Sequence, residues 1–357
     1  RTGEAGMPGY YTDYNFTIER SMTPSTLWRG SFHANYGVKV QATQNFDQLD
    51  PKYWSAYGTL LGSNLSTMVN AAGQPTNSVL IANGFRLPYA AYPLNLALNQ
   101  ALRPYPQYSG VSGPSLSGHS TYNALETSLE HRFDKGFYAL ASYTFSKAIA
   151  SAQGQNVYDH LTDRAVAGFD RTHVFALSYI YDLPFGKGKR LLNGVSPVVN
   201  AFVGNWSVAG VHRYQTGNPL TPGCGQQMYN AGSARCSLVP GESLYNANWN
   251  PDDPTSQYIN PKAFVQPANM VYGNMPAVLS QLRQPNQLNE DLAISKIFRL
   301  GRQEARRLEF RASAFNLANR HLLGGITTGV TSATFGRITS PQSNQPRNVE
   351  ASLRFTY

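Results

Sequence analysis

The chain has 357 residues, a formal net charge of +9, a charged fraction of only 14% and an aromatic fraction of 12%. Disordered chains are charged and poor in aromatic residues, and collagen needs a glycine at every third position, so both classes are excluded. No run of about 18 apolar residues occurs, which argues against a helical membrane protein. Two cysteines are too few for a disulfide-rich miniprotein. The composition fits an all-β protein whose loops are polar without being charged.

Apolar and polar residues alternate along the whole chain, which is the pattern of strands with two unlike faces. The alternation predicts about nine strands. In chain order their alternating cores are residues 14–18, 28–36, 125–133, 137–145, 175–181, 206–214, 292–298, 308–314 and 349–357. The sequence Asp134-Lys135-Gly136 between the third and fourth predicts a tight hairpin turn.

The predicted strands are roughly ten to thirteen residues long, whereas strands of soluble proteins average about five or six. A tilted strand that crosses a bilayer needs about 9–11 residues. The length therefore favours an antiparallel up-and-down transmembrane β-barrel. A soluble β-sandwich remains the alternative, because one of its faces also packs against a core.

The predicted connections alternate between short and long. Short links fall near residues 23–26, 134–136, 184–203 and 300–305, and long links near 39–120, 150–170, 217–287 and 319–346. In an up-and-down sheet, alternate links lie at the same end. Bacterial outer-membrane barrels have short periplasmic turns and long extracellular loops, so the parity predicts that orientation and a bacterial outer-membrane location.

The two faces of the strands differ in polarity, which predicts a polar lumen and an apolar outer surface. No Arg or Lys is expected in mid-strand on the lipid face, where it would cost about 2–4 kcal/mol. The predicted lumen-facing residues are Arg29, His33, Glu126, Glu130, Arg132, Glu309, Arg311 and Arg354. The predicted lipid-facing residues are Trp28, Phe32, Tyr36, Leu129, Phe137, Tyr143, Leu177, Tyr179 and Phe310.

The basic residues of the chain gather in the short links, for example at Lys187, Lys189 and Arg190. A net positive charge can indicate nucleic-acid binding. Here the charges occupy separate turns without any nucleic-acid-binding motif. We therefore interpret them as solvated periplasmic turns and expect no nucleic-acid partner.

Cys224 and Cys236 both fall in the long 217–287 link. An extracellular loop lies in an oxidising compartment, so we predict a disulfide, with free thiols or half of a metal site as the alternatives. The acidic and basic residues of the 150–170 link could bind a cation or serve as acid and base, but a salt-linked loop is the favoured interpretation. These residues are Asp159, His160, Asp163, Arg164, Asp170 and Arg171.

No catalytic constellation, metal motif or cofactor motif assembles in the sequence. The seven histidines show no metal-binding spacing. Gly186-Lys187-Gly188-Lys189 is too short for a phosphate-binding loop. We expect no enzyme and no cofactor, and the sequence identifies no substrate-binding residue.

The chain ends in aromatic residues at alternate positions, with Leu353, Phe355 and Tyr357 on one face. This run resembles the C-terminal signal that the outer-membrane barrel assembly machinery reads. Ser352 stands where that pattern usually has glycine. The barrel assembly machinery and outer-membrane lipid are therefore expected partners, although any amphipathic closing strand could look similar.

Several stretches, in order, resemble the C-terminal barrel of TonB-dependent outer-membrane receptors, and most closely their Oar-like branch. Each stretch is weak alone, and together they cover nearly the whole chain. They are Phe46-Asp-Gln-Leu-Asp-Pro-Lys-Tyr53, Tyr122-Asn-Ala-Leu125, Leu129-Glu-His-Arg-Phe133, Ala141-Ser-Tyr-Thr-Phe-Ser-Lys147, Leu177-Ser-Tyr-Ile-Tyr-Asp-Leu-Pro-Phe-Gly-Lys-Gly-Lys-Arg190, Asn260-Pro-Lys-Ala-Phe264, Phe310-Arg-Ala-Ser-Ala-Phe-Asn-Leu317 and Thr334-Phe-Gly-Arg-Ile-Thr339.

The resemblance implies a 22-stranded barrel filled by a plug, which takes up a large substrate with energy passed through TonB. The plug, an N-terminal carboxypeptidase-regulatory-like domain, a TonB box and a signal peptide have no counterpart here, so residues 1–357 are expected to be the C-terminal part of such a barrel. The TonB system would be a partner through the missing plug. The substrate could be a glycan, a peptide or a metal chelate.

Two other functions remain open at this stage. A self-contained small porin or adhesin would occupy the same membrane, but bacterial single-chain barrels have an even number of strands. A secreted soluble β-sandwich could bind carbohydrate through exposed Tyr and Trp. Solubility without detergent would contradict both barrel interpretations.

Overall fold

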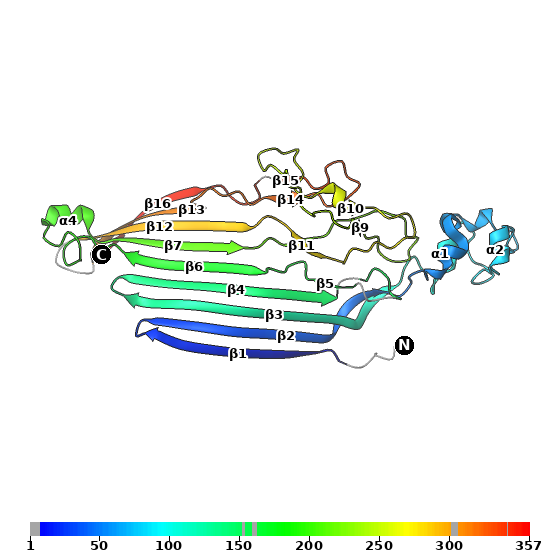
Figure 1. Cartoon of the computed structure of the whole chain (residues 1–357), viewed down its shortest axis with the longest axis horizontal. Helices are drawn as coiled ribbons and strands as arrows, with labels where there is room; N and C mark the ends of the chain where they lie inside the picture. Colours follow the sequence, from blue (N-terminus) through cyan, green and yellow to red (C-terminus); the bar gives the residue numbers. More distant parts are fainter. Residues whose placement is uncertain (1–7, 152–153, 159–162, 301–305, 341) are drawn as a thin grey trace.

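The computed structural model describes residues 8–151, 154–158, 163–300, 306–340 and 342–357. Nine long strands form one antiparallel sheet in which each strand pairs with its neighbours in chain order (Figure 1). They are β1 (Tyr10–Thr23), β2 (Thr26–Asn45), β3 (Ser112–Asp134), β4 (Phe137–Ser151), β6 (His173–Asp182), β7 (Trp206–Gln215), β12 (Gln287–Arg299), β13 (Arg307–Phe315) and β16 (Asn348–Thr356). The all-β, up-and-down architecture that the alternation predicts is confirmed.

The two ends of the sheet are unlike. The chain turns sharply between β1 and β2 and between β3 and β4, and it crosses between β6 and β7 and between β12 and β13 at the same end, which we call the short-link end. The other four connections are long and gather at the opposite end, the long-link end (Figure 1). The links alternate between the two ends as predicted, but their lengths do not separate fully, because the 183–205 link at the short-link end is longer than the 152–172 link at the long-link end. The C-terminus lies at the short-link end.

The strands form where apolar and polar residues alternate, and the pairing preserves that alternation across the sheet. Phe32 of β2 pairs with Phe16 of β1 and with Leu125 of β3, so these three side chains share one face. On the opposite face Thr17 and Ser31 hydroxyl oxygens lie 3.0 Å apart. A slip of one residue would exchange the faces, so the alternation fixes the register.

The long link between β2 and β3 folds into a small helical unit that projects from the end of the sheet (Figure 1). It holds α1 (Lys52–Tyr57), α2 (Ser78–Ala82), α3 (Leu98–Ala101) and two 3₁₀ segments at Gly58–Gly62 and Leu65–Thr67. Leu61, Leu80 and Leu98 are fully buried in its own hydrophobic core. Among the residues that the structure describes, no helix is long and apolar enough to span a membrane.

The other long links form a second compact layer with its own core. It contains β8 (Pro219–Leu220), β9 (Ser237–Leu238), β10 (Phe264–Val265), β11 (Leu279–Arg283), β14 (Gly324–Ile326), β15 (Ile338–Ser340) and a 3₁₀ segment at Pro261–Ala263. The short strand β5 (Arg164–Val166) of the link between β4 and β6 pairs with β4 and extends the main sheet instead. Ile259 and Leu282 are fully buried there, and Phe264 stacks edge-on against Phe335 at 5.8 Å. Both cores therefore lie in the loops.

Three features differ from the sequence-based expectation. The strands β2 and β3 run on to Asn45 and back to Ser112, so the link between them is shorter than predicted. The link between β6 and β7 contains a helix, α4 (Pro197–Val203). The expectation that the apolar face carries no Lys or Arg in a strand is wrong, because Lys296 of β12 pairs with Trp206 on that face.

Candidate functional site

The polar residues predicted to face a lumen share one face of the sheet. Glu126 pairs with Ser31, and Glu309 pairs directly with Arg354. Arg29 Nε donates to Glu19 Oε1 at 2.6 Å, and His33 Nε2 lies 3.7 Å from Glu126 Oε2. The same registers place Arg311 and Glu130 on this face, and the alternation places Arg132 there too. The result is a continuous polar surface along the strands.

The residues predicted to face lipid lie on the opposite face. Trp28 pairs with Leu129, Phe137 with Tyr181, and Ala141 with Leu177. The remaining members of this set are Phe32, Tyr36, Tyr143, Tyr179 and Phe310, and the registers place them on the same face. The contact of this face with lipid stays a prediction, as does the role of Leu353, Phe355 and Tyr357 as an assembly signal.

A cavity of about 740 Å³ opens where β2 and β3 reach the long-link end. Two long links complete its wall: the one between β4 and β6, and the one between β7 and β12. The polar lining residues are Tyr36, Thr43, Gln44, Asn45, Gln48, Ser117, His119, Ser120, Thr121, Ser151, Asp163, Arg164, Asn230 and Ser233. Amides and hydroxyls dominate this lining, which suits a neutral ligand rich in hydrogen-bonding groups.

Gln48 joins the end of β2 to one of the loops that line this cavity. It is 1% exposed, and its Nε2 donates to Asn156 Oδ1 at 3.0 Å. Its Oε1 accepts from the Val157 amide at 3.0 Å, and its carbonyl accepts from the Tyr158 hydroxyl at 3.1 Å. A buried side chain that is satisfied at both ends holds its partners at a fixed distance. Gln48 therefore fixes the 154–158 segment against the end of β2.

Asp163 and Arg164 are charged residues of the cavity lining, and they differ in their partners. Asp163 Oδ1 lies 3.5 Å from Arg235 Nη2 and accepts from the Gln155 amide at 3.1 Å. Burial lowers the pKa of the Arg235 guanidinium, while the nearby Asp163 carboxylate acts in the opposite direction. Arg164 Nη2 donates to Thr121 Oγ1 at 3.3 Å. Arg235 therefore balances the charge of Asp163, whereas Arg164 contacts a neutral hydroxyl of β3.

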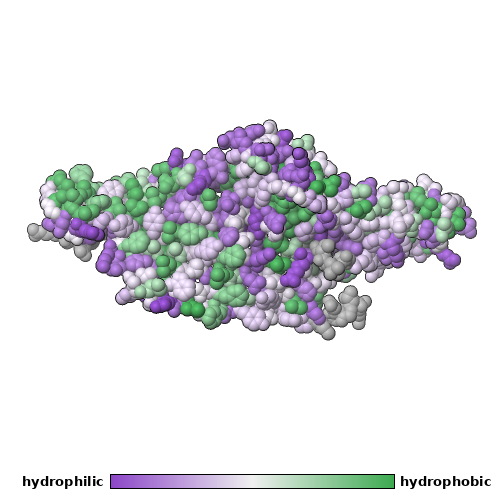
Figure 2. Space-filling model, viewed as in Figure 1, coloured by the Kyte–Doolittle hydropathy of each residue, from purple (hydrophilic) through white to green (hydrophobic). Residues whose placement is uncertain are grey.

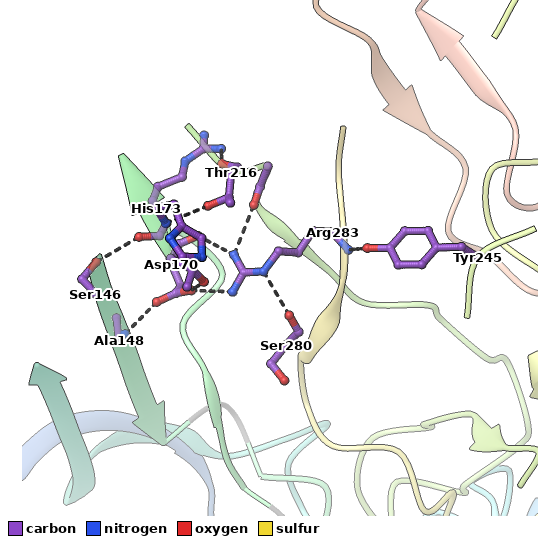
Figure 3. A network of polar contacts seen from close by, with 11 residues as sticks. Ser146, Ala148, Asp170, His173, Thr216, Tyr245, Ser280 and Arg283 are labelled. Atoms are coloured by element: carbon purple, nitrogen blue, oxygen red, sulfur yellow. Dashed lines mark hydrogen bonds and ion pairs between the residues drawn. The ribbon is translucent and has the colours of Figure 1, made fainter. Parts of the chain in front are cut away.

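A second buried ion pair ties two long links to the sheet (Figure 3). Arg283 Nη2 contacts Asp170 Oδ2 at 2.6 Å, and the Asp170 side chain is 1% exposed. Asp170 Oδ1 accepts from the Ala148 amide of β4 at 2.7 Å. Arg283 Nη1 donates to the carbonyl oxygens of Asp170 and Gly217 at 3.1 and 3.2 Å. The pair therefore connects β4 with two links, the one between β4 and β6 and the one between β7 and β12.

Two further links stabilise the loop layer. Cys224 and Cys236 form a disulfide with a Cα–Cα distance of 5.1 Å. Arg103 Nη1 lies 3.3 Å from Asp47 Oδ2, whose side chain is fully buried. The Tyr105 amide donates to Asp47 Oδ1 at 2.9 Å. This pair attaches the helical unit to the end of β2.

The predicted salt-linked loop is present, although its partners come from elsewhere in the chain. Asp163 pairs with Arg235, Asp170 pairs with Arg283, and Arg171 donates to the Thr216 carbonyl at 2.6 Å. Asp159 and His160 lie outside the described residues. Within the described ranges, no group of three or more His, Cys, Asp or Glu is placed to hold a metal.

Sequence reasoning missed both long-range arginine partners and the cavity lining. Arg283 is 113 positions from Asp170, and no local pattern marks such a contact. Gln48 and Asn230 stand in stretches without alternation. The one signal near them was the Phe46–Tyr53 stretch, which was recognised by resemblance alone.

The comparisons with known proteins give one family match. No curated protein is significantly similar to the chain in sequence. Among solved structures, the outer membrane transporter YddB from Escherichia coli is 8% identical with a TM-score of 0.43, and the match covers 98% of this chain and 33% of that one. The profile of the outer membrane beta barrel domain family matches residues 5–350. The chain therefore belongs to that family, which places it in the bacterial outer membrane.

Proposed function

We propose that the chain is the C-terminal barrel segment of a TonB-dependent transporter of the Oar-like type, and that its long-link end captures a large substrate outside the cell. The observation that carries the proposal is the cavity of about 740 Å³ between β2, β3 and two long links. The buried pair Asp170–Arg283 holds those links in place. An extracellular receptor needs such a preformed site.

The strand count favours a segment over a self-contained porin. In the described sheet, β1 and β16 each pair on one side only. Nine up-and-down strands would bring these two together in parallel if they closed on themselves. Bacterial single-chain barrels have an even number of antiparallel strands, so the proposal includes further strands between the two edges.

The lining of the cavity narrows the class of substrate. Amides and hydroxyls supply both donors and acceptors, and Asp163 is already engaged by Arg235. A metal chelate with several negative charges would need unpaired cations, whereas a glycan or a peptide needs dispersed hydrogen bonds. We propose a neutral oligosaccharide or peptide as the substrate.

The test compares ion conductance in planar bilayers before and after mild urea treatment. The protein is extracted from outer membranes together with the sequence that naturally flanks this chain. A barrel filled by a plug should conduct little at first and more after urea loosens the plug. Immediate, stable conductance would instead favour the self-contained porin. Solubility without detergent would contradict both.

A second measurement tests the capture site. Binding of fluorescent oligosaccharides and short peptides to the detergent-solubilised protein should fall when Asn45 and Gln48 are both changed to Ala. Asn95→Ala, an exposed change in the helical unit, is the matched control. Equal binding by the variant and the control would contradict the assignment of the cavity.

A further inference from the structure

The helix α4 presents its apolar residues outwards. Val198, Val199 and Phe202 are 70%, 45% and 71% exposed. Val198 and Val199 precede Phe202 by four and three positions, so each of them lies beside Phe202 on one face of the helix. Leu191 and Leu192 of the same link are 47% and 50% exposed. Figure 2 shows the corresponding hydrophobic surface around α4 at the short-link end.

The polar side of the same helix faces the protein. Asn200 Oδ1 accepts from the Lys187 amide at 2.6 Å, which ties α4 to the turn that precedes it. At this close approach there is no room for a side chain on Gly186, since a Cβ there would lie 2.6 Å from Asn200 Oδ1. Helices on water-exposed surfaces have the reverse orientation, with the apolar side inwards. The outward face of α4 is therefore built for an apolar environment.

The end of α4 is attached to the apolar face of the sheet. Lys296 Nζ donates to the carbonyl oxygens of Phe202 and Gly204 at 3.1 and 2.6 Å. It also lies 4.9 Å from the ring centres of Trp206 and Phe298. A cation at the C-terminus of a helix is favoured by the helix dipole. Lys296 thus satisfies its charge on this face by binding the link.

We propose that α4 and the surrounding 183–205 link form a membrane-surface anchor that inserts into the periplasmic leaflet of the outer membrane, with phospholipid as its occupant. The proposal rests on membership of the outer-membrane family and on the apolar face of the sheet, and it is independent of the proposed transport. The apolar surface of α4 continues the apolar face of β12 and β7 past the strand ends.

Charge complementarity supports phospholipid as the occupant. Lys187, Lys189 and Arg190 lie in the same link, within ten residues of the start of α4. Interfacial anchors combine an apolar face that enters the acyl region with basic residues near the phosphate groups. A helix of seven residues does not persist alone in water, so the contacts of Asn200 and Lys296 fix it before lipid binds.

The test measures depth in the bilayer with a fluorescent label. Phe202→Cys is labelled with bimane in the protein reconstituted in vesicles of phosphatidylethanolamine and phosphatidylglycerol that contain lipids brominated on the acyl chains. The native cysteines are joined to each other and do not react without reductant. Val198→Cys is a second site, and Asn95→Cys, exposed in the helical unit at the opposite end of the sheet, is the control.

Quenching and a blue shift of the emission at positions 198 and 202, without quenching at 95, are the expected result. Absence of quenching at 198 and 202 would overturn the proposal, because the face would then be covered by protein or by water. Equal quenching at all three positions would also overturn it. In the Phe202→Cys background, Lys296→Met should reduce the quenching at 202, and unchanged quenching would contradict the role of Lys296 as the attachment.

Discussion

The sheet and the loop layer follow opposite rules of burial. In the loops, Leu61 and Ile259 are fully buried, as in a water-soluble protein. In the sheet, Leu125 and Phe145 of the internal strands β3 and β4 are 57% and 48% exposed. The chain itself covers the apolar residues of the loops, whereas the apolar residues of the sheet remain exposed on its surface.

This difference indicates two separate sources of stability. The loop layer folds by removing apolar surface from water, and it is reinforced by buried ion pairs and a disulfide. The sheet has its backbone hydrogen bonds, and lipid around its apolar face is the predicted second source of its stability. Changes in the loops should therefore alter the loops without dismantling the sheet, and changes on the apolar face should act only in a bilayer.

The largest effect is expected from Arg283→Met. The change leaves the Asp170 carboxylate buried without its cation, and breaking a buried pair typically costs about 3–5 kcal/mol. Hydrogen exchange in detergent should show faster exchange in the 163–172 and 216–286 links and unchanged exchange in β3. Lys52→Gln, which breaks the exposed pair with Asp50, is the control. Equal acceleration in β3 would contradict the separation of loops and sheet.

Next in size is the effect of Leu98→Ala in the helical unit. Leu98 is fully buried in that core, and removal of a buried Leu side chain costs about 2–5 kcal/mol. Limited proteolysis should cut the 46–111 link much faster than in the parent protein. The control Ile81→Ala removes a side chain that is 58% exposed. Rapid cleavage of both variants would indicate that the unit has no core of its own.

The alternation of the strands carried most of what the sequence could predict. A period of two determines which side chains share a face, so the sets containing Glu126 and Leu129 were assigned correctly to opposite faces. The alternating links predicted which connections lie at the same end of the sheet. The loops could not be predicted in this way, because Asp170 meets Arg283 only through the fold of two distant links.

The hydrophobic pattern of the sequence also failed to predict the short helices and the charged residue Lys296 on the apolar face. The helices α2 and α3 have five and four residues, which is too few for a 3.6-residue period to appear. Lys296 was not recognised as part of the apolar face because three apolar neighbours, Leu292, Ile294 and Phe298, dominated the alternation. Lys296 binds the carbonyl oxygens of Phe202 and Gly204 at the end of α4, and this contact between distant parts of the chain is visible only in the structure.

A charge on the apolar face should act only in lipid. Leu129→Arg would place a cation on the face predicted to border the acyl chains, at a cost of about 2–4 kcal/mol near the bilayer centre. Ser142→Arg is the matched control, because Ser142 lies on the polar face opposite Ser128 and diagonal to Glu126 and Glu130. Folding yield in vesicles should fall for Leu129→Arg alone. A similar loss for both variants would contradict the assignment of the faces.

The smallest effect is expected from Asn77→Ala at the start of α2. The Asn77 side chain accepts from the Val79 amide at 2.9 Å, and loss of such a cap typically costs about 1 kcal/mol. The helical unit should remain folded, because its buried leucines are untouched, while amide exchange at residues 78–80 rises modestly. Asn95→Ala, an exposed change in the same link, should leave that exchange unaltered. A loss as large as that of Leu98→Ala would show that local capping, rather than the buried core, holds this unit together.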